Sequence, residues 1–202
     1  MAPKKQPKKQ ARKQSTKPAT KRPATKRPAA RPAMKQDAAA ASLAREFMAE
    51  LDAELRVTRR CVERVPSDKG PWKPHPSSAP IGHLTQLICG MVGILANIPK
   101  GVDLNLSSDV RYSFEQTSTL LGVFDANEKK LRASLAAVKP EDWSKTWRVL
   151  VGEQVLSTAS RKDAMRNTIN HLIHHRGQLT VYLRMNEAKI PQLYGPSGDE
   201  RG

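Results

Sequence analysis

Cysteine is scarce in this chain of 202 residues, which contains only Cys61 and Cys89. Two cysteines cannot provide the disulfide framework on which small secreted domains rely, and both lie in apolar, helix-like surroundings. We therefore expect two buried thiols in a protein from a reducing compartment. Neither cysteine has a histidine beside it in a catalytic pattern, so a cysteine hydrolase is not indicated.

Long apolar runs are also missing. The longest extends over 12 residues, from Leu87 to Ile98, and includes two glycines and an asparagine. This length suits a buried helix, because a membrane-spanning helix needs about 20 apolar residues. We see no secretory signal pattern. We therefore expect a cytoplasmic protein without a membrane partner.

Several nucleotide-binding and hydrolase motifs are absent. The sequence has no G-x-x-x-x-G-K-[ST], no G-x-G-x-x-G after a strand and no G-x-S-x-G. These patterns supply phosphate-binding backbone amides or an exposed serine nucleophile. The nucleotide, dinucleotide and serine-hydrolase classes that depend on them are therefore not supported.

Acidic residues are missing from the N-terminal 36 residues, which contain 13 Lys or Arg and 6 Pro. This segment contributes +13 of the formal net charge of +16, and the first carboxylate is Asp37. A five-residue quasi-repeat, Pro-Ala-Thr-Lys-Arg, begins at Pro18 and again at Pro23. Because almost nothing apolar larger than alanine is available for burial, we expect residues 1–37 to be a disordered tail.

The composition of this tail resembles the Lys/Ala/Pro-rich tails of linker histones. A basic, extended chain binds phosphate backbones through counterion release, without reading their sequence. We therefore expect the tail to contact nucleic acid, and the alternative is a tail that only keeps the protein in solution. The residues expected to make these contacts are Lys4, Lys5, Lys8, Lys9, Arg12, Lys13, Lys17, Lys21, Arg22, Lys26, Arg27, Arg31 and Lys35.

Residues 38–200 are expected to form one domain with four helices, because apolar residues recur every three or four positions. The expected helices cover residues 42–65, 78–98, 113–139 and 160–186. Between the third and fourth helices, residues 147–156 contain a tight turn at Gly152-Glu153 and predict a small β-hairpin. The predicted fold is all-α, a four-helix bundle with this hairpin between helices three and four.

Serine residues predict where three of these helices begin. A serine oxygen at a helix N-terminus accepts a hydrogen bond from an amide that the helix leaves unpaired. The caps expected for the second, third and fourth helices are Ser78, Ser113 with Gln116, and Ser160 with Asp163.

Three of the five histidines lie within five residues, at His171, His174 and His175. His171 and His175 are four positions apart and share one face of the predicted fourth helix. Imidazoles at this spacing can bind one transition-metal ion from a single helix. The glutamate of the H-E-x-x-H motif is absent, so a zinc protease is not indicated. Two histidines are an incomplete site, and a third ligand has to come from elsewhere.

Further motifs surround this histidine pair. They are Trp72-Lys73-Pro74-His75, Ile81-Gly82-x-Leu84, His171-x-x-x-His175-Arg176-Gly177-Gln178-Leu179 and Pro191-x-x-Tyr194-Gly195-Pro196-Ser197. Together they resemble the DinB (damage-inducible) superfamily over residues 43–200. The resemblance implies a DinB-like four-helix bundle, a homodimer and a divalent metal, nickel or zinc. It also implies an enzyme of the thiol-transferase or hydrolase type that acts on a small molecule with a low-molecular-weight thiol.

The resemblance carries two metal ligands over to His171 and His175, but not the third. The family has its third histidine on the second helix, in the pattern Ile-Gly-x-Leu-x-x-His, and this chain has Leu87 there. His83 lies four residues earlier on the same helix face, about 6 Å along the axis. Three explanations stay open. Either His83 completes the site through a shift in helix register, or the site is degenerate, or a carboxylate or His174 is the third ligand.

Two polar residues flank the histidine pair on the same helix. Asn167 and Gln178 can orient an imidazole or position a substrate, and the alternative is ordinary hydrogen bonding within the protein or to water. Arg176 is interpreted either as the partner of a carboxylate or as part of a solvated helix face.

The sequence therefore predicts a DinB-like, metal-dependent S-transferase or hydrolase with a basic tail that contacts nucleic acid. The alternative is a non-catalytic DinB-like dimer, localised to DNA by its tail, in which the metal site is degenerate.

Overall fold

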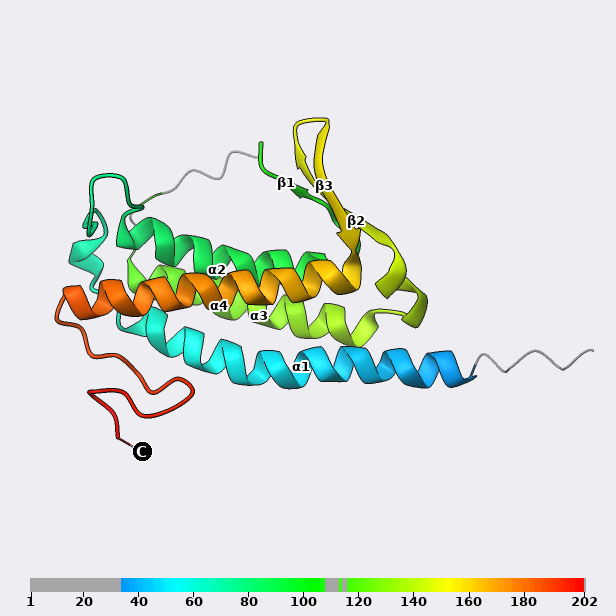
Figure 1. Ribbon diagram of the computed structural model, residues 1–202, viewed down its shortest axis with the longest axis horizontal. Coiled ribbons are helices and arrows are strands. Elements are labelled where there is room, and N and C mark those ends of the chain that lie inside the picture. The colour runs from blue at the N-terminus through cyan, green and yellow to red at the C-terminus, as the bar shows by residue number, and fades with distance from the viewer. Residues whose placement is uncertain (1–33, 108–112, 114–115, 202) are drawn as a thin grey trace, which may run out of the picture. The chain divides into compact units, whose positions relative to one another are not determined.

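The computed structural model describes residues 34–107, 113 and 116–201, and of residues 34–42 it describes the backbone alone. The predicted tail residues from Lys4 to Arg31 lie outside the described residues. The described part of the chain contains four α-helices, as the sequence predicts: α1 (Met34–Glu63), α2 (Ile81–Asn97), α3 (Thr117–Ala137) and α4 (Arg161–Met185) (Figure 1).

Helix α1 begins at Met34, earlier than the expected start at Ser42. Alanine has the highest helix propensity of all residues, and an unbroken run of alanines, 38–41, leads into the predicted start. The helix therefore extends backwards through residues 34–37, which the sequence analysis included in the tail, and Lys35 lies in its first turn.

The expected caps of α2 and α3 are wrong. Helix α2 follows Pro80 rather than Ser78, because the residue before a proline avoids the helical conformation. Helix α3 follows Gln116 rather than Ser113, and its first amide, of Thr117, donates to Ser67 Oγ at 3.0 Å. A residue 50 positions earlier in the chain thus caps α3, which a local sequence pattern does not reveal.

The expected cap of α4 is confirmed. Ser160 Oγ accepts a hydrogen bond from the amide of Asp163 at 3.1 Å, and the Ser160 hydroxyl also contacts the Asp163 carboxylate at 2.6 Å. The carboxylate in the first turn complements the positive end of the helix dipole. The residue at which α4 begins therefore follows from four consecutive residues.

The four helices share one apolar core. Helix α2 packs against α3 and α4, and α1 packs against the same two helices. Helices α2 and α4 lie side by side and run in opposite directions (Figure 1). Within the described part of the chain, no helix is long and apolar enough to cross a membrane.

Both cysteines are buried in this core and neither forms a disulfide. Removal from water disfavours the charged thiolate, so burial raises the pKa of Cys61 to about 11 and that of Cys89 to about 12. The two thiols are therefore protonated at neutral pH and do not serve as nucleophiles.

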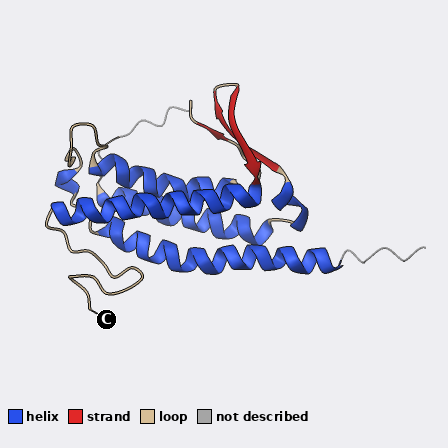
Figure 2. Cartoon of the chain, in the orientation of Figure 1, coloured by secondary structure: helices blue, strands red, loops and turns tan. Residues whose placement is uncertain are grey.

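A small sheet stands at one end of α2 and α4 (Figure 2). The expected hairpin is formed by β2 (Thr146–Val151) and β3 (Gln154–Ser160), which turn at Gly152 with a φ of +59°. A further strand that the sequence does not predict, β1 (Leu104–Asn105), pairs in parallel with β2. Trp147 Nε1 donates to the carbonyl of Val102 at 2.7 Å and so fastens β2 beside the segment that leads into β1.

The segment after α4 folds back along α1 (Figure 1). Glu200 accepts a hydrogen bond from the amide of Gln192 and pairs with Arg64 and Arg60. These contacts favour the ionised carboxylate and lower the pKa of Glu200 to about 2. These contacts join the C-terminal segment to the end of α1, and Tyr194 of this segment hydrogen-bonds Glu54 of α1 and Arg176 of α4.

Candidate metal centre and the adjoining cavity

His171 and His175 meet on one face of α4. Their Nε2 atoms lie 2.8 Å apart, and their ring centroids lie 4.5 Å apart with the planes inclined by 42°. This arrangement follows from helix geometry, because side chains four residues apart stack one turn above the other. The Nε2 edges of the two rings therefore face one another.

Gln178 determines which nitrogen of His175 carries the proton. Gln178 Oε1 lies 2.8 Å from His175 Nδ1. An amide oxygen only accepts hydrogen bonds, so Nδ1 carries the hydrogen and Nε2 of the neutral ring is left as an acceptor facing His171. A hydrogen bond to the far ring nitrogen is the usual support of a metal-bound histidine.

The spacing of the two nitrogens suits a shared proton and also a shared metal ion. Two nitrogens that bind one ion at about 2.0–2.1 Å are separated by about 2.9 Å at a right angle and by about 3.3 Å at the tetrahedral angle of zinc, so a shared zinc ion requires the rings to move apart by about half an ångström. Partial desolvation, followed by the charges of His175 and His174, lowers the pKa of His171. His171 is therefore a neutral imidazole at pH 7, the form that binds metals.

A third ligand is not assembled around the pair. Among the described residues, no group of three His, Cys, Asp or Glu side chains comes together as a metal site. Leu87 on α2 faces the pair, since it lines both the cavity that His171 lines and the cavity that His175 lines. His83 lines the second of these cavities, together with His175 and Gln178. His174 is exposed, and its ring lies edge-on to that of His175.

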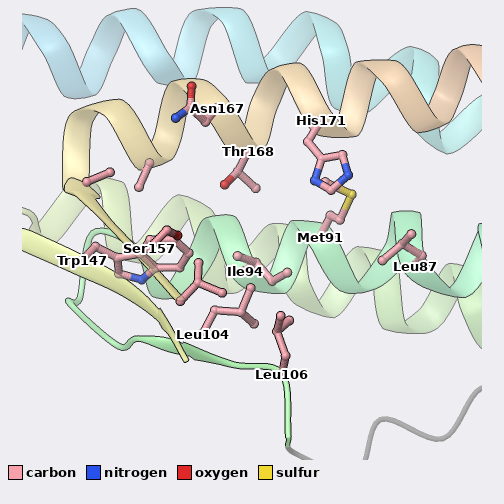
Figure 3. A pocket seen from close by; sticks show the side chains of 13 residues that line it. Leu87, Met91, Ile94, Leu104, Leu106, Trp147, Ser157, Asn167, Thr168 and His171 are labelled. Atoms are coloured by element: carbon pink, nitrogen blue, oxygen red, sulfur yellow. The ribbon is translucent and has the colours of Figure 1, made fainter. Parts of the chain in front are cut away.

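An apolar cavity of about 380 Å³ adjoins His171 (Figure 3). Helix α2 lines it with Leu87, Met91 and Ile94, and the sheet lines it with Trp147, Val149 and Ala159. Asn167 lies on the cavity side of His171, whereas Gln178 lies beyond His175 on the other side. The two flanking polar residues therefore have different surroundings.

Arg176, which immediately follows His175, points the other way and is 1% exposed. Its Nη1 donates to Glu54 Oε2 on α1 at 2.6 Å, and its Nη2 donates to the hydroxyl of Tyr194 at 2.6 Å. The Tyr194 hydroxyl in turn donates to the Glu54 carboxylate, with distances of 3.0 and 2.9 Å to its two oxygens. The interpretation of Arg176 as part of a solvated face is wrong, and the pairing with a carboxylate is correct.

The partners of Arg176 are distant from it in sequence and were not predicted. Glu54 precedes it by 122 residues on a helix with several other acids, and Tyr194 follows it by 18 residues in a segment without secondary structure. The signal that could have indicated a carboxylate partner is the position of Arg176, in the Arg-Gly-Gln sequence directly after the histidines, within an amphipathic helix. A buried arginine in such a helix is seldom found without a carboxylate.

Comparison with solved structures identifies the fold. A DinB-like protein from Bacillus cereus ATCC 10987 is 15% identical, with a TM-score of 0.59 over 73% of this chain and 95% of that chain. A DinB-like protein from Bacillus subtilis is 21% identical, with a TM-score of 0.56 over 73% of this chain and 96% of that chain. No protein-family profile matches the sequence, and no curated protein matches it. The fold is DinB-like, and at this identity the likeness concerns the fold alone.

Replacing Arg176 with methionine should lower the free energy of unfolding by about 3–5 kcal/mol, because Glu54 then stays buried without a cation. Tyr194→Phe, which removes one hydroxyl, should cost about 1 kcal/mol. Both losses in the free energy of unfolding are to be measured by urea unfolding monitored by tryptophan fluorescence. The double variant Arg176→Met/Glu54→Gln is the control and should recover part of the loss. A loss below about 1 kcal/mol for Arg176→Met would mean that the buried pair does not constrain α4.

Proposed function

We propose that this protein, with its DinB-like fold, is a divalent-metal-dependent enzyme of the thiol-transferase or hydrolase type. The observation that carries the proposal is the pair of His171 and His175 Nε2 atoms, 2.8 Å apart at the edge of an apolar cavity. An i, i+4 pair whose far nitrogen is held by an amide oxygen is the usual preparation of histidines for a metal.

The described residues would have different roles in such a metal site. His171 and His175 would hold a nickel or zinc ion, and Gln178 keeps the His175 ring in the required tautomer. The bound ion would lower the pKa of a low-molecular-weight thiol and so provide a thiolate nucleophile. Neither cysteine of the chain can take that role, because both thiols are buried with raised pKa values. Asn167, which lines the cavity one turn before His171, would hydrogen-bond a substrate.

We propose His83 as the third ligand. It is the histidine of α2 that lines a cavity with His175, although Leu87 lies nearer to the pair. Reaching a common ion requires a local movement of α2 or of the histidine side chains. The assignment of His83 as a ligand is therefore independent of the assignment of His171 and His175, and His83→Ala is tested as a separate variant.

Metal content tests the centre. Untagged protein loaded with nickel or zinc should retain about one equivalent, measured by mass spectrometry after gel filtration. His171→Ala and His175→Ala should each lose it, because one imidazole does not hold a divalent ion through gel filtration. His83→Ala should lose it only if His83 is the third ligand. His174→Ala is the matched control and should retain it. A wild-type protein that retains no metal would contradict the function.

Leu87→His should strengthen the centre. Leu87 faces both histidines from α2, so an imidazole there completes a three-histidine set with vacant positions for substrate. Zinc affinity, measured by competition with a chromogenic chelator, should rise at least tenfold, about 1.4 kcal/mol. Ile94→His is the control on the same face of α2, two turns further from the pair, and should leave the affinity unchanged. An equal affinity in wild type and Leu87→His would show that α2 does not approach the bound ion.

The basic tail supports a second candidate function. Thirteen cations without an acid in the first 36 residues suit nonspecific contact with nucleic acid. We propose that the tail localises the domain to DNA and that the protein is a homodimer. In the alternative hypothesis the dimer is non-catalytic and its metal site is degenerate. The metal measurement above separates this alternative from the enzyme.

Deleting residues 1–33 tests the tail and leaves α1 intact from Met34. Duplex DNA binding, measured by fluorescence anisotropy at several salt concentrations, should weaken at least tenfold in the truncated protein. The slope of log affinity against log salt should also become shallower, by about 0.9 for each DNA phosphate that the tail neutralises. Circular dichroism should show the same helical signal per molecule in both proteins. Unchanged affinity after truncation would rule the tail out as the DNA-binding segment.

A further inference from the structure

The cavity beside His171 has walls from separate parts of the chain. One face of α2 and one face of α4 form two sides, and β1 with the hairpin forms the third (Figure 3). Its volume of about 380 Å³ lies within the range of small-molecule pockets, about 300–1,000 Å³. The residues of the sheet side are Leu104, Leu106, Trp147, Val149, Ser157 and Ala159.

The lining carries no formal charge. Among the described residues that form it there is no Asp, Glu, Lys or Arg, and the polar side chains are Ser157, Asn167, Thr168 and His171. An ion in such a cavity would lose its hydration without gaining an opposite charge, which costs several kcal/mol. In the metal-free protein, the described lining therefore favours uncharged molecules over charged ones.

Three of the four polar side chains, Asn167, Thr168 and His171, belong to α4, and the fourth, Ser157, belongs to β3. Figure 3 shows Thr168 and His171 projecting from α4 toward α2, with His171 beside Met91. Leu106, at the rim, is 55% exposed, an apolar surface that a bound molecule would cover. A ligand that matches this distribution has an apolar body against α2 and β1 and a polar group against α4.

We propose that this cavity binds the electrophilic substrate, an uncharged molecule with an apolar body whose reacting group lies at His171. The inference rests on the proposed function for the reaction, but the binding itself depends only on the cavity. His171 lines the cavity and contacts His175, so a molecule held there has its polar end beside the candidate metal centre. The hairpin and β1 then have a function, since they close the side of the cavity that the helices leave open.

The experiment is calorimetric titration of full-length, chelator-treated protein with 1,3-dinitrobenzene and with 3,5-dinitrobenzoate. The two probes share a ring and differ by a carboxylate. The neutral probe should bind saturably with a stoichiometry of about one, and the anion at least tenfold more weakly. Equal binding of the two probes, or no saturable binding of the neutral one, would overturn the proposal.

The second measurement is probe binding by a variant in which a larger side chain fills the cavity. Thr168→Phe places a ring in the cavity from α4 and should weaken binding of the neutral probe at least tenfold. Val181→Phe, at a position of the same helix that is 57% exposed, should leave it unchanged. Binding unaffected by Thr168→Phe would place the probe elsewhere. The titration uses metal-free protein, so its result is independent of the metal measurement. Saturable probe binding together with no metal retention would contradict the proposed enzyme and support the cavity proposal. Metal retention without probe binding would support the metal centre and contradict the cavity proposal.

Discussion

The buried pair of Arg176 and Glu54 fixes how α4 is rotated in the domain. A buried guanidinium without a carboxylate would be strongly unfavourable, so α4 can pack only with this side toward α1. Successive residues of a helix are about 100° apart, and the orientation of Arg176 therefore sets that of His175 before it. Both histidines consequently face α2 rather than α1. Tyr194 strengthens this constraint, because its hydroxyl joins both charged groups from the C-terminal segment.

Several functional features follow from that one orientation. The histidine pair lies at the α2 side, where Leu87 faces it, and the next turns of α4 form a wall of the apolar cavity. The core holds both cysteines at raised pKa values, so neither of these two thiols is a thiolate nucleophile at neutral pH. One helix thus carries a structural ion pair on one side and a candidate reaction site on another.

The DinB-like fold accounts for the scaffold but does not by itself supply a reaction, because one fold hosts many chemistries. What distinguishes this chain is local. A leucine faces the histidine pair, a histidine lies one turn away on α2, and an uncharged cavity lies beside both. These particular residues, rather than the fold, carry the proposals made above.

The sequence by itself determined what depends on neighbours along the chain. Helical periodicity located four helices, the Ser160-Asp163 box located the start of α4, and the i, i+4 spacing brought His171 and His175 together. Tertiary structure alone decided what depends on residues distant in sequence. Ser67 sets the start of α3, and a two-residue strand at Leu104 joins a hairpin more than 40 positions later. The partners of Arg176 and the walls of the cavity likewise come from separate segments. Local backbone geometry is encoded within a few residues, whereas burial and charge pairing exist only once distant segments meet.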